Sequence, residues 1–180
     1  VTYYKLFGEA WCCDGFAAGD KKHSFPLGAE SVTYTYNPYA PAKFKGGLSA
    51  NFGGNAWQYK PKIQPDVISF FTPEFEEDTF VKGKMTAKLR VRSDCEDTCF
   101  YLRLSLGKEE GWYGLRDDIT SLCYQLGDYV PGTDVQLDFN FDEHAFLIRR
   151  GQRLRVDIAS ADNAHYVRHT NMKGLYCEQP

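Results

Sequence analysis

The chain has 180 residues, of which 43% are hydrophobic and 16% aromatic, a composition that favours one globular domain with a core of its own. Its formal charge of −3, from 21 basic and 24 acidic residues, gives no reason to expect nucleic acid or an anionic membrane as a partner. We also expect no membrane span, because no run of about 18 apolar residues occurs. The chain begins at Val1 within the strand-like "VTYYKLF", without a signal-peptide pattern, and we interpret it as a segment of a longer polypeptide.

The first part of the chain combines strand-like stretches with a long irregular segment. "SVTYTY" at 31–36 is rich in β-branched and aromatic residues and predicts a strand. Residues 37–66 contain prolines, paired glycines and several aromatic residues but follow no sustained period. Such aromatic residues need a surface to pack on, and a long irregular stretch in a compact domain is usually functional. Two interpretations stay equally open: a loop over its own domain, or a contact surface for a neighbour.

The alternation of apolar and polar residues decides the fold class. A period of two predicts half-buried antiparallel strands with one face in water. It occurs in four stretches: "MTAKLRVRS" (85–93), "FYLRLSL" (100–106), "VQLDFNF" (135–141) and "RLRVDIAS" (153–160). "DVISFF" at 66–71 is a further candidate strand, and turn-forming stretches separate these elements. We therefore predict an all-β, jelly-roll β-sandwich as a single domain over residues 1–180, with 37–66 as an irregular wrapping segment.

Two stretches have a less certain local structure. In residues 117–126, "DDITSLCYQL", apolar residues recur at helical spacing, but the flanks favour a strand or a single helical turn, and both remain open. Further along, Asp142 and Glu143 precede His144 in what we expect to be an acidic turn. A histidine beside two carboxylates invites an enzymatic interpretation, but the favoured role of His144 is to cap this turn.

Four arginines near the end of the chain could form an anion-binding patch: Arg149, Arg150, Arg153 and Arg155. Arg153 and Arg155 alternate with apolar residues, which predicts that they share the solvated face of a strand. Acidic residues such as Asp138 or Asp142 could pair with them across strands. We favour this solvated face over an anion-binding site.

No catalytic centre follows from the sequence. The nucleophile elbow of serine hydrolases requires G-x-S-x-G, and the nearest stretch, "GLSAN" around Ser49, lacks the second glycine. Neighbouring carboxylates fall in or beside turns, where solvated acids are common, and neither a glycosidase pair nor a calcium loop is specified. These carboxylates are Asp94, Glu96, Asp97, Glu109, Glu110, Asp117, Asp118, Asp142 and Glu143. We assign no catalytic residue to this chain.

The cysteines do not form a zinc pattern. No C-x-x-C occurs among Cys12, Cys13, Cys95, Cys99, Cys123 and Cys177. Cys95 and Cys99 form the one plausible local pair. His165 and His169 have i, i+4 spacing, but "HYVRHTN" lacks a helical apolar stripe and a suitable glutamate. We expect reduced thiols in a cytoplasmic protein, and we assign no metal and no cofactor.

The order of these stretches resembles the C-terminal domain of X-Pro dipeptidyl-peptidases and cocaine-esterase-like (CocE/NonD) hydrolases. The resemblance covers nearly the whole chain and rests on "VTYYKLFGEAW" (1–11), "YTYNPYAP" (34–41) with Gly46-Gly47, "DVISFFTPEFEEDTFVKGKMTAKLRVRSDCEDTCF" (66–100), "VPGTDVQLDFNFDEHAFLIRRGQRLRVDIASAD" (130–162) and "RHTNMKG" (168–174). The chain departs from the usual family pattern at Asn37, Cys99 and Ala164-His165, and "RHTNMKG" is one residue longer than the usual ending.

The resemblance implies a jelly-roll domain similar to galactose-binding modules, packed against an upstream α/β-hydrolase domain of the same polypeptide. In such proteins the serine, histidine and aspartate of the hydrolase domain carry the chemistry. All three would precede Val1, in a serine hydrolase acting on X-Pro peptides, amino-acid esters or other acyl substrates. The domain would then help to shape the substrate pocket or form an oligomer contact.

Two other function classes remain as alternatives. A carbohydrate-binding module would use aromatic faces to stack on sugar rings, and Trp11, Trp57 and Trp112 are the candidates. Tryptophans that pack a core or an interface are the commoner case. A cysteine-based metal or redox domain is the least favoured alternative.

Overall fold

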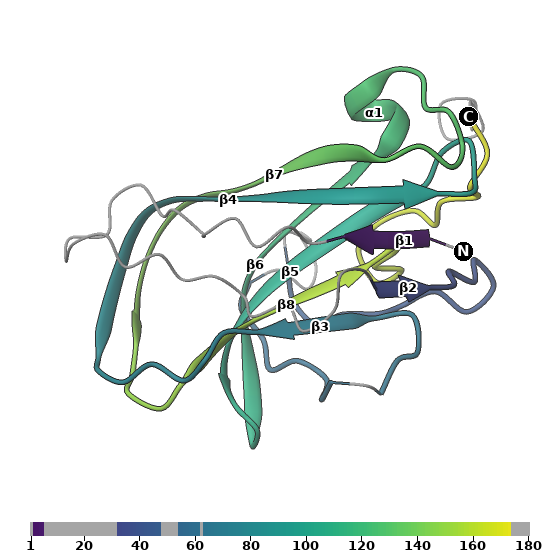
Figure 1. Cartoon of the computed structure of the whole chain (residues 1–180). Coiled ribbons are helices and arrows are strands. Elements are labelled where there is room, and N and C mark those ends of the chain that lie inside the picture. Colours follow the sequence, from purple (N-terminus) through teal and green to yellow (C-terminus); the bar gives the residue numbers. More distant parts are fainter. Residues whose placement is uncertain (1, 6–31, 48–53, 62, 174–180) are drawn as a thin grey trace.

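A computed structural model describes residues 2–5, 32–47, 54–61 and 63–173 of the chain. In this part, eight strands form two four-stranded antiparallel sheets, with the orders β2-β1-β4-β7 and β3-β8-β5-β6 (Figure 1). The strands are β1 (Thr2–Lys5), β2 (Val32–Tyr34), β3 (Ile68–Phe71), β4 (Thr79–Ser93), β5 (Cys99–Lys108), β6 (Gly111–Ser121), β7 (Val135–Ile148) and β8 (Arg153–Ala159). The prediction of an all-β sandwich is confirmed. That residues 1–180 form one domain stays a prediction.

The core lies between the two sheets. In β4 the inward residues Met85, Leu89 and Val91 are buried, and their neighbours along the strand are exposed, as the alternation predicts. From the facing sheet, Phe100, Leu102 and Ile158 join the same cluster. Burying a large apolar side chain contributes about 1.5–3 kcal/mol. The alternating apolar residues therefore hold the two layers together.

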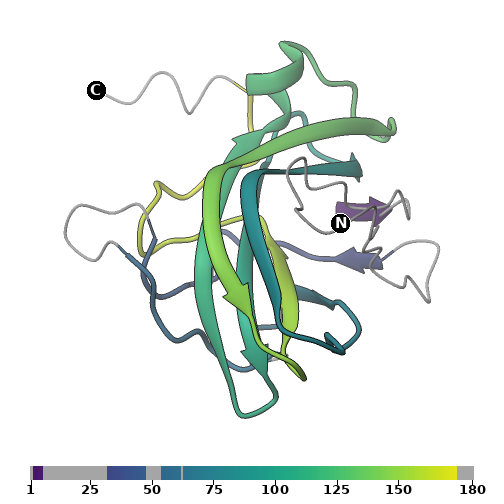
Figure 2. The same cartoon turned by 90° about the vertical axis from the view of Figure 1, so that its left-hand side faces the viewer.

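The acidic turn expected around His144 is wrong, because β7 continues through it to Ile148. Lys84 pairs with Glu143 and Thr86 with Asn140, so β7 holds one residue more than β4 between these pairs. Asp142 has a φ of 62° at this point. The extra residue is accommodated as a β-bulge, which bends a strand without ending it. Both long strands curve together in Figure 2.

Residues 117–126 contain both of the structures left open by the sequence. The stretch begins in β6, which ends at Ser121, and continues as the single helical turn α1 (Leu122–Leu126). The Ser121 hydroxyl caps this turn by accepting a hydrogen bond from the Tyr124 N–H. Within the same turn, Gln125 reaches β7, donating to the Asp138 carbonyl and accepting from the Asp138 N–H. The turn is therefore fixed against the edge of the first sheet.

The second sheet departs from the expected pattern on its outer face. Arg155 was expected on a solvated face, but only 2% of it is exposed, so that prediction is wrong. Pairing of Arg153 or Arg155 with Asp138 or Asp142 is also wrong, because β8 pairs with β3 and β5 and not with β7. Arg153 is half-buried and donates through Nε to the Thr72 carbonyl at 2.6 Å. The polar side of β8 faces a covering layer of protein.

Arg149 and Arg150 do lie at the surface, beside the β7–β8 turn. Both bind Asp78: the Arg149 Nη1 lies 2.7 Å from its Oδ2, and the Arg150 N–H donates to its Oδ1. Among the residues that the structure describes, no helix has the length and apolar character needed to cross a membrane.

Candidate functional site

The layer over the outer face of the second sheet is formed by residues 37–66, here called the covering segment and described over 37–47, 54–61 and 63–66. Its Phe44 ring packs on Tyr101 of β5 with ring centroids 4.7 Å apart. Further along, Trp57 pairs with Tyr113 as an antiparallel bridge. Hydrogen bonds from Gln58 N to Trp112 O (2.7 Å) and from Gly114 N to Ala56 O (2.8 Å) flank this bridge. The covering segment is therefore joined to the β6 edge by an isolated β-bridge.

One buried arginine holds the first part of the covering segment. Only 1% of Arg103 is exposed, and its Nη1 donates to the Gly46 carbonyl (3.2 Å) and to the Tyr101 hydroxyl (3.1 Å). The same nitrogen lies 3.9 Å from Oδ2 of Asp117. Burial raises the pKa of Asp117, and the Arg103 charge opposes this rise. Gly114 makes room for the guanidinium, because a Cβ there would lie 2.4 Å from Nη2.

A second buried arginine holds the end of the covering segment. Arg155 donates through Nη1 to the Tyr59 carbonyl and through Nε to Oδ1 of Asp157, both at 2.7 Å. Asp157 also accepts a 2.5 Å hydrogen bond from the Ser69 hydroxyl. The pKa of Asp157 is raised by burial despite these partners. The Arg155 guanidinium lies over the Trp112 ring, 5.7 Å from its centroid.

These groups form a buried polar layer rather than a reaction centre. Arg103 and Asp157 occupy directly opposite positions on β5 and β8, and Ser105 lies opposite Arg155. Among the described residues, Arg103 Nε, the Ser105 hydroxyl and Asp157 Oδ2 are buried without a hydrogen-bond partner. Taking charges out of water costs several kcal/mol per ion, and losing one partner of such a pair leaves the other uncompensated. The layer therefore makes the position of the covering segment depend on a few specific contacts.

Two aspartate–histidine pairs occur elsewhere in the described residues, and neither completes a catalytic triad. His165 Nδ1 lies 2.5 Å from Asp162 Oδ2, and no described hydroxyl or thiol hydrogen-bonds to its Nε2. His169 contacts Asp97 through Nε2 at 3.2 Å, while its Nδ1 accepts the Asn171 N–H. Both ring nitrogens of His169 are thus occupied. A triad needs a nucleophile on the second nitrogen of the histidine.

His144 does not cap a turn, because it lies within β7. Its Nε2 accepts a hydrogen bond from Arg116 Nε at 3.2 Å and contacts the Phe141 carbonyl. Asp142 and Glu143 are exposed beside it. The charged stretch that looked most like a site in the sequence is therefore the bulged part of a strand.

The other candidate residues are dispersed. Cys95, Cys99 and Cys123 are free thiols. Burial raises the pKa of Cys99 to about 12, so this thiol is protonated at neutral pH. Within the described ranges, no group of three His, Cys, Asp or Glu side chains could hold a metal ion. Ser49, Cys12, Cys13, Cys177 and Trp11 lie outside the described residues.

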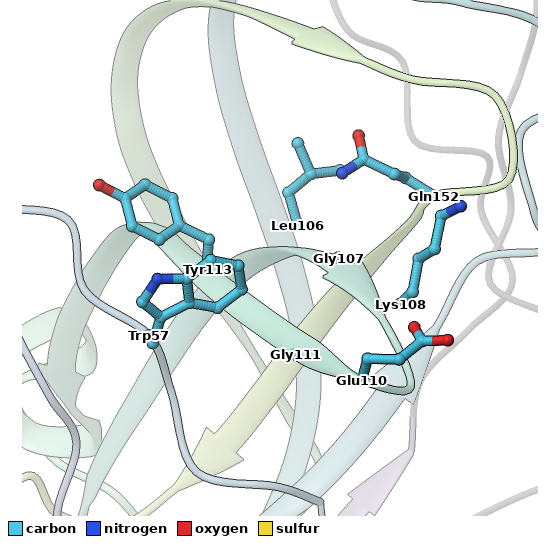
Figure 3. Close-up of a pocket in the computed structure, with 8 residues that line it drawn as sticks. All are labelled: Trp57, Leu106, Gly107, Lys108, Glu110, Gly111, Tyr113 and Gln152. Atoms are coloured by element: carbon cyan, nitrogen blue, oxygen red, sulfur yellow. The ribbon is translucent and has the colours of Figure 1, made fainter.

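The surface beside the covering segment is hollowed around Trp57 (Figure 3). An open depression of about 580 Å³ is lined by Trp57, Leu106, Gly107, Lys108, Glu110, Gly111, Tyr113 and Gln152. Trp57 is 63% exposed, whereas Trp112 is buried in contact with Phe71. Of the three tryptophans considered from the sequence, Trp57 is the described one with a surface available to a ligand.

Sequence reasoning missed the buried polar layer and the hollow beside it. A usable signal was present, because 37–66 carries aromatic residues that need a surface, and β5 and β8 supply a polar face. Nothing in the alternation itself, however, pairs Arg103 with Gly46 or Arg155 with Tyr59.

The comparisons with known proteins agree with the architecture. An aminopeptidase from the marine sediment archaeon Thaumarchaeota archaeon matches with a TM-score of 0.71 and 17% identity, over 94% of this chain and 31% of its own. A selenomethionine-labelled α-amino acid ester hydrolase matches with a TM-score of 0.68 and 16% identity, over 79% of this chain and 27% of its own. The chain thus spans less than a third of either structure, and at these identities the likeness establishes the fold.

Three further findings concern a third solved structure, the curated proteins and the protein families. A CocE/NonD family hydrolase from Staphylococcus aureus matches more weakly, with a TM-score of 0.47 and 15% identity, over 74% of this chain and 28% of its own. No curated protein matches the chain significantly. Residues 21–180 match the family described as the X-Pro dipeptidyl-peptidase C-terminal non-catalytic domain. The resemblance noted in the sequence is confirmed, and the chain belongs to this family of non-catalytic domains.

Proposed function

We propose that this chain is the accessory domain of a serine hydrolase, packed against an upstream α/β-hydrolase domain of the same polypeptide and helping to shape its substrate pocket. The observation that carries the proposal is the match of residues 21–180 to a non-catalytic domain of X-Pro dipeptidyl-peptidases. The parent would cleave X-Pro peptides or hydrolyse acyl and amino-acid esters. No residue of this chain would act on the scissile bond, and no cofactor or metal would be needed here.

The architecture supports this role through rigidity. Backbone hydrogen bonds join the covering segment to β6. Buried arginines also hold it, through hydrogen bonds to the carbonyl groups of Gly46 and Tyr59. A wall of a substrate pocket must hold its position, because misplacing a binding group weakens catalysis without touching the chemistry. A sandwich that fixes its own irregular segment is suited to such a supporting part.

The test compares the chain with its parent. We expect the purified parent polypeptide to hydrolyse an X-Pro p-nitroanilide or a p-nitrophenyl ester, with activity abolished by replacing the serine of a G-x-S-x-G motif upstream of Val1. The 1–180 chain alone should release no p-nitrophenol above background. Burst kinetics from that chain would refute the proposal, as would an upstream sequence without a hydrolase pattern.

Two further features belong to the same proposal. A cytoplasmic location is supported by the free thiols of Cys95, Cys99 and Cys123, since exported proteins tend to pair their cysteines. Association of the parent into a homo-oligomer, with this domain at a contact, is the other. Light scattering of the parent across a concentration series would test that contact.

A further inference from the structure

The depression beside β6 is built on a tryptophan whose main chain is held by hydrogen bonds. The two backbone hydrogen bonds that flank Trp57, Gln58 N to Trp112 O and Gly114 N to Ala56 O, fix its main chain on the sheet edge. The six-membered part of its indole packs on Gly111, where any Cβ would lie 2.9 Å from Cζ3. Despite these contacts, 63% of Trp57 is exposed, which leaves much of the indole available to a ligand.

A second aromatic residue completes a platform. Tyr113 is 37% exposed, and its ring lies 5.4 Å from the Trp57 ring, tilted by 66°. Figure 3 shows the two rings together on one side of the depression, with Lys108 and Glu110 on the other and Gln152 near Leu106. The platform and the polar side chains come from different elements but face one hollow.

The polar side chains around the platform supply both kinds of hydrogen-bonding group without net charge. Lys108 donates, the Glu110 carboxylate accepts, and Gln152 offers an amide whose Oε1 already accepts the Arg149 N–H at 2.8 Å. One positive and one negative charge cancel, so the hollow does not select a strongly charged ligand. Ligand sites commonly combine an apolar surface with a few polar groups that orient the ligand.

We propose that this depression binds a neutral pyranose ring, stacked on Trp57 and bordered by Tyr113. The sugar C–H face would lie on the indole, and the sugar hydroxyl groups would donate to Glu110 and accept from Lys108 and the Gln152 amide nitrogen. The role of the site is to hold the protein on a glycan or glycosylated substrate, which goes beyond the accessory-domain function.

The experiment is a binding titration of the full polypeptide with methyl β-galactopyranoside, methyl α-glucopyranoside and maltotriose. We expect saturable binding of at least one probe by calorimetry, with a Kd on the order of 1 mM. Saturation-transfer NMR should show the strongest transfer to the ring C–H protons that face the indole. Trp57→Ala should weaken binding at least about tenfold, and Glu110→Gln should weaken it by a smaller factor.

Tyr124→Ala is the matched control, because Tyr124 is an exposed aromatic residue on α1, outside the depression. It should leave the Kd unchanged. If Trp57→Ala fails to fold, Glu110→Gln decides the outcome, since this side chain is exposed in the turn between β5 and β6. Absence of saturable binding by all three probes overturns the proposal, and so does binding that survives both variants. A fall in thermal stability of the full polypeptide on Trp57→Ala, without sugar binding, would identify the depression as an interdomain contact instead.

Discussion

The two sheets share the same alternating pattern but differ in what surrounds their outward charges. On the first sheet, the outward side chains of β4 are exposed, and Arg90 and Arg92 both pair with Asp134 at the surface. On the second, Arg103 and Arg155 occupy equivalent outward positions on β5 and β8 and are buried beneath the covering segment. The polar face of a strand can therefore be exposed to solvent or buried, depending on whether a segment distant in sequence covers it. Replacing a charged residue on the covered face of the second sheet should therefore reduce stability far more than replacing one on the exposed face of the first sheet.

The largest difference is expected at Arg155. Arg155→Met leaves the fully buried Asp157 without its charged partner and removes the bond to the Tyr59 carbonyl. We expect unfolding in urea to show a loss of about 3–5 kcal/mol. Adding Asp157→Leu should recover part of that loss, because the uncompensated charge disappears. If Arg155→Met reduced the free energy of unfolding no more than Arg92→Met on the exposed face of the first sheet, the expected difference between the two sheets would be wrong.

A smaller loss should follow from Gly114→Ala, which tests the space between the covering segment and β6. The new Cβ would lie 2.4 Å from Arg103 Nη2 and 2.8 Å from Gln58 Nε2, and both groups are held by hydrogen bonds. Overpacking of this kind costs about 1–3 kcal/mol. Thr86→Ala, exposed on β4, is the control and should change the unfolding midpoint little. An unchanged midpoint for Gly114→Ala would show that the covering segment yields easily.

The pH dependence of stability should have opposite signs on the two faces. Burial raises the pKa of Asp117 in the folded state. Its contribution to the free energy of unfolding is therefore fully present below the unfolded pKa of about 3.8 and is lost as pH rises through the folded pKa. A hydrogen bond from Arg92 lowers the pKa of Asp134, so its contribution is present above the unfolded value and is lost as pH falls through the folded pKa. Unfolding free energies of Asp117→Asn and Asp134→Asn, compared with the parent sequence from about pH 2 to 7, should give difference slopes of opposite sign, above about pH 3.8 for Asp117 and below it for Asp134. Slopes of the same sign would show that the covered and exposed faces do not differ in how pH affects their stability.

The smallest effect is expected for Arg92→Met. This residue pairs with Asp134 at 2.8 Å, but both side chains are substantially exposed, and surface pairs contribute little. The change in melting temperature should be close to that of Lys88→Met, and raising the salt concentration should remove any remaining difference. A large, salt-insensitive effect would mean that this face is also covered.

The sequence was most informative where one side of a strand meets water. The alternation in β4 and β7 predicted their inward residues, because the environment of each strand is simply core on one side and solvent on the other. It misjudged Arg155 because polarity distinguishes two faces of a strand but does not reveal a covering layer supplied from residues 37–66. The prediction of a turn around His144 was wrong for a local reason. The polar residues at a β-bulge, such as Asp142 and Glu143, are also the residue types that form turns, so composition does not distinguish the two.

The surface depression could be anticipated only in part. Trp57 was among the candidate sugar-stacking residues, but its exposure depends on the backbone bridge to Tyr113 and on the close approach of Gly111. Those contacts join positions more than fifty residues apart, and no local pattern encodes them. The family, by contrast, was recognisable from the order of its motifs.

The contact between α1 and β7 has a consequence for how the molecule meets its neighbours. β7 is the last strand of its sheet, and such strands offer unpaired peptide groups on which another chain can extend the ladder. Here the Gln125 amide occupies both peptide groups of Asp138, Asp118 accepts the Asn140 N–H, and the bulge at Asp142 breaks the regular spacing. Strand addition is thereby hindered along residues 138–142 of this border. This stretch of β7 is therefore a poor starting point for edge-to-edge aggregation.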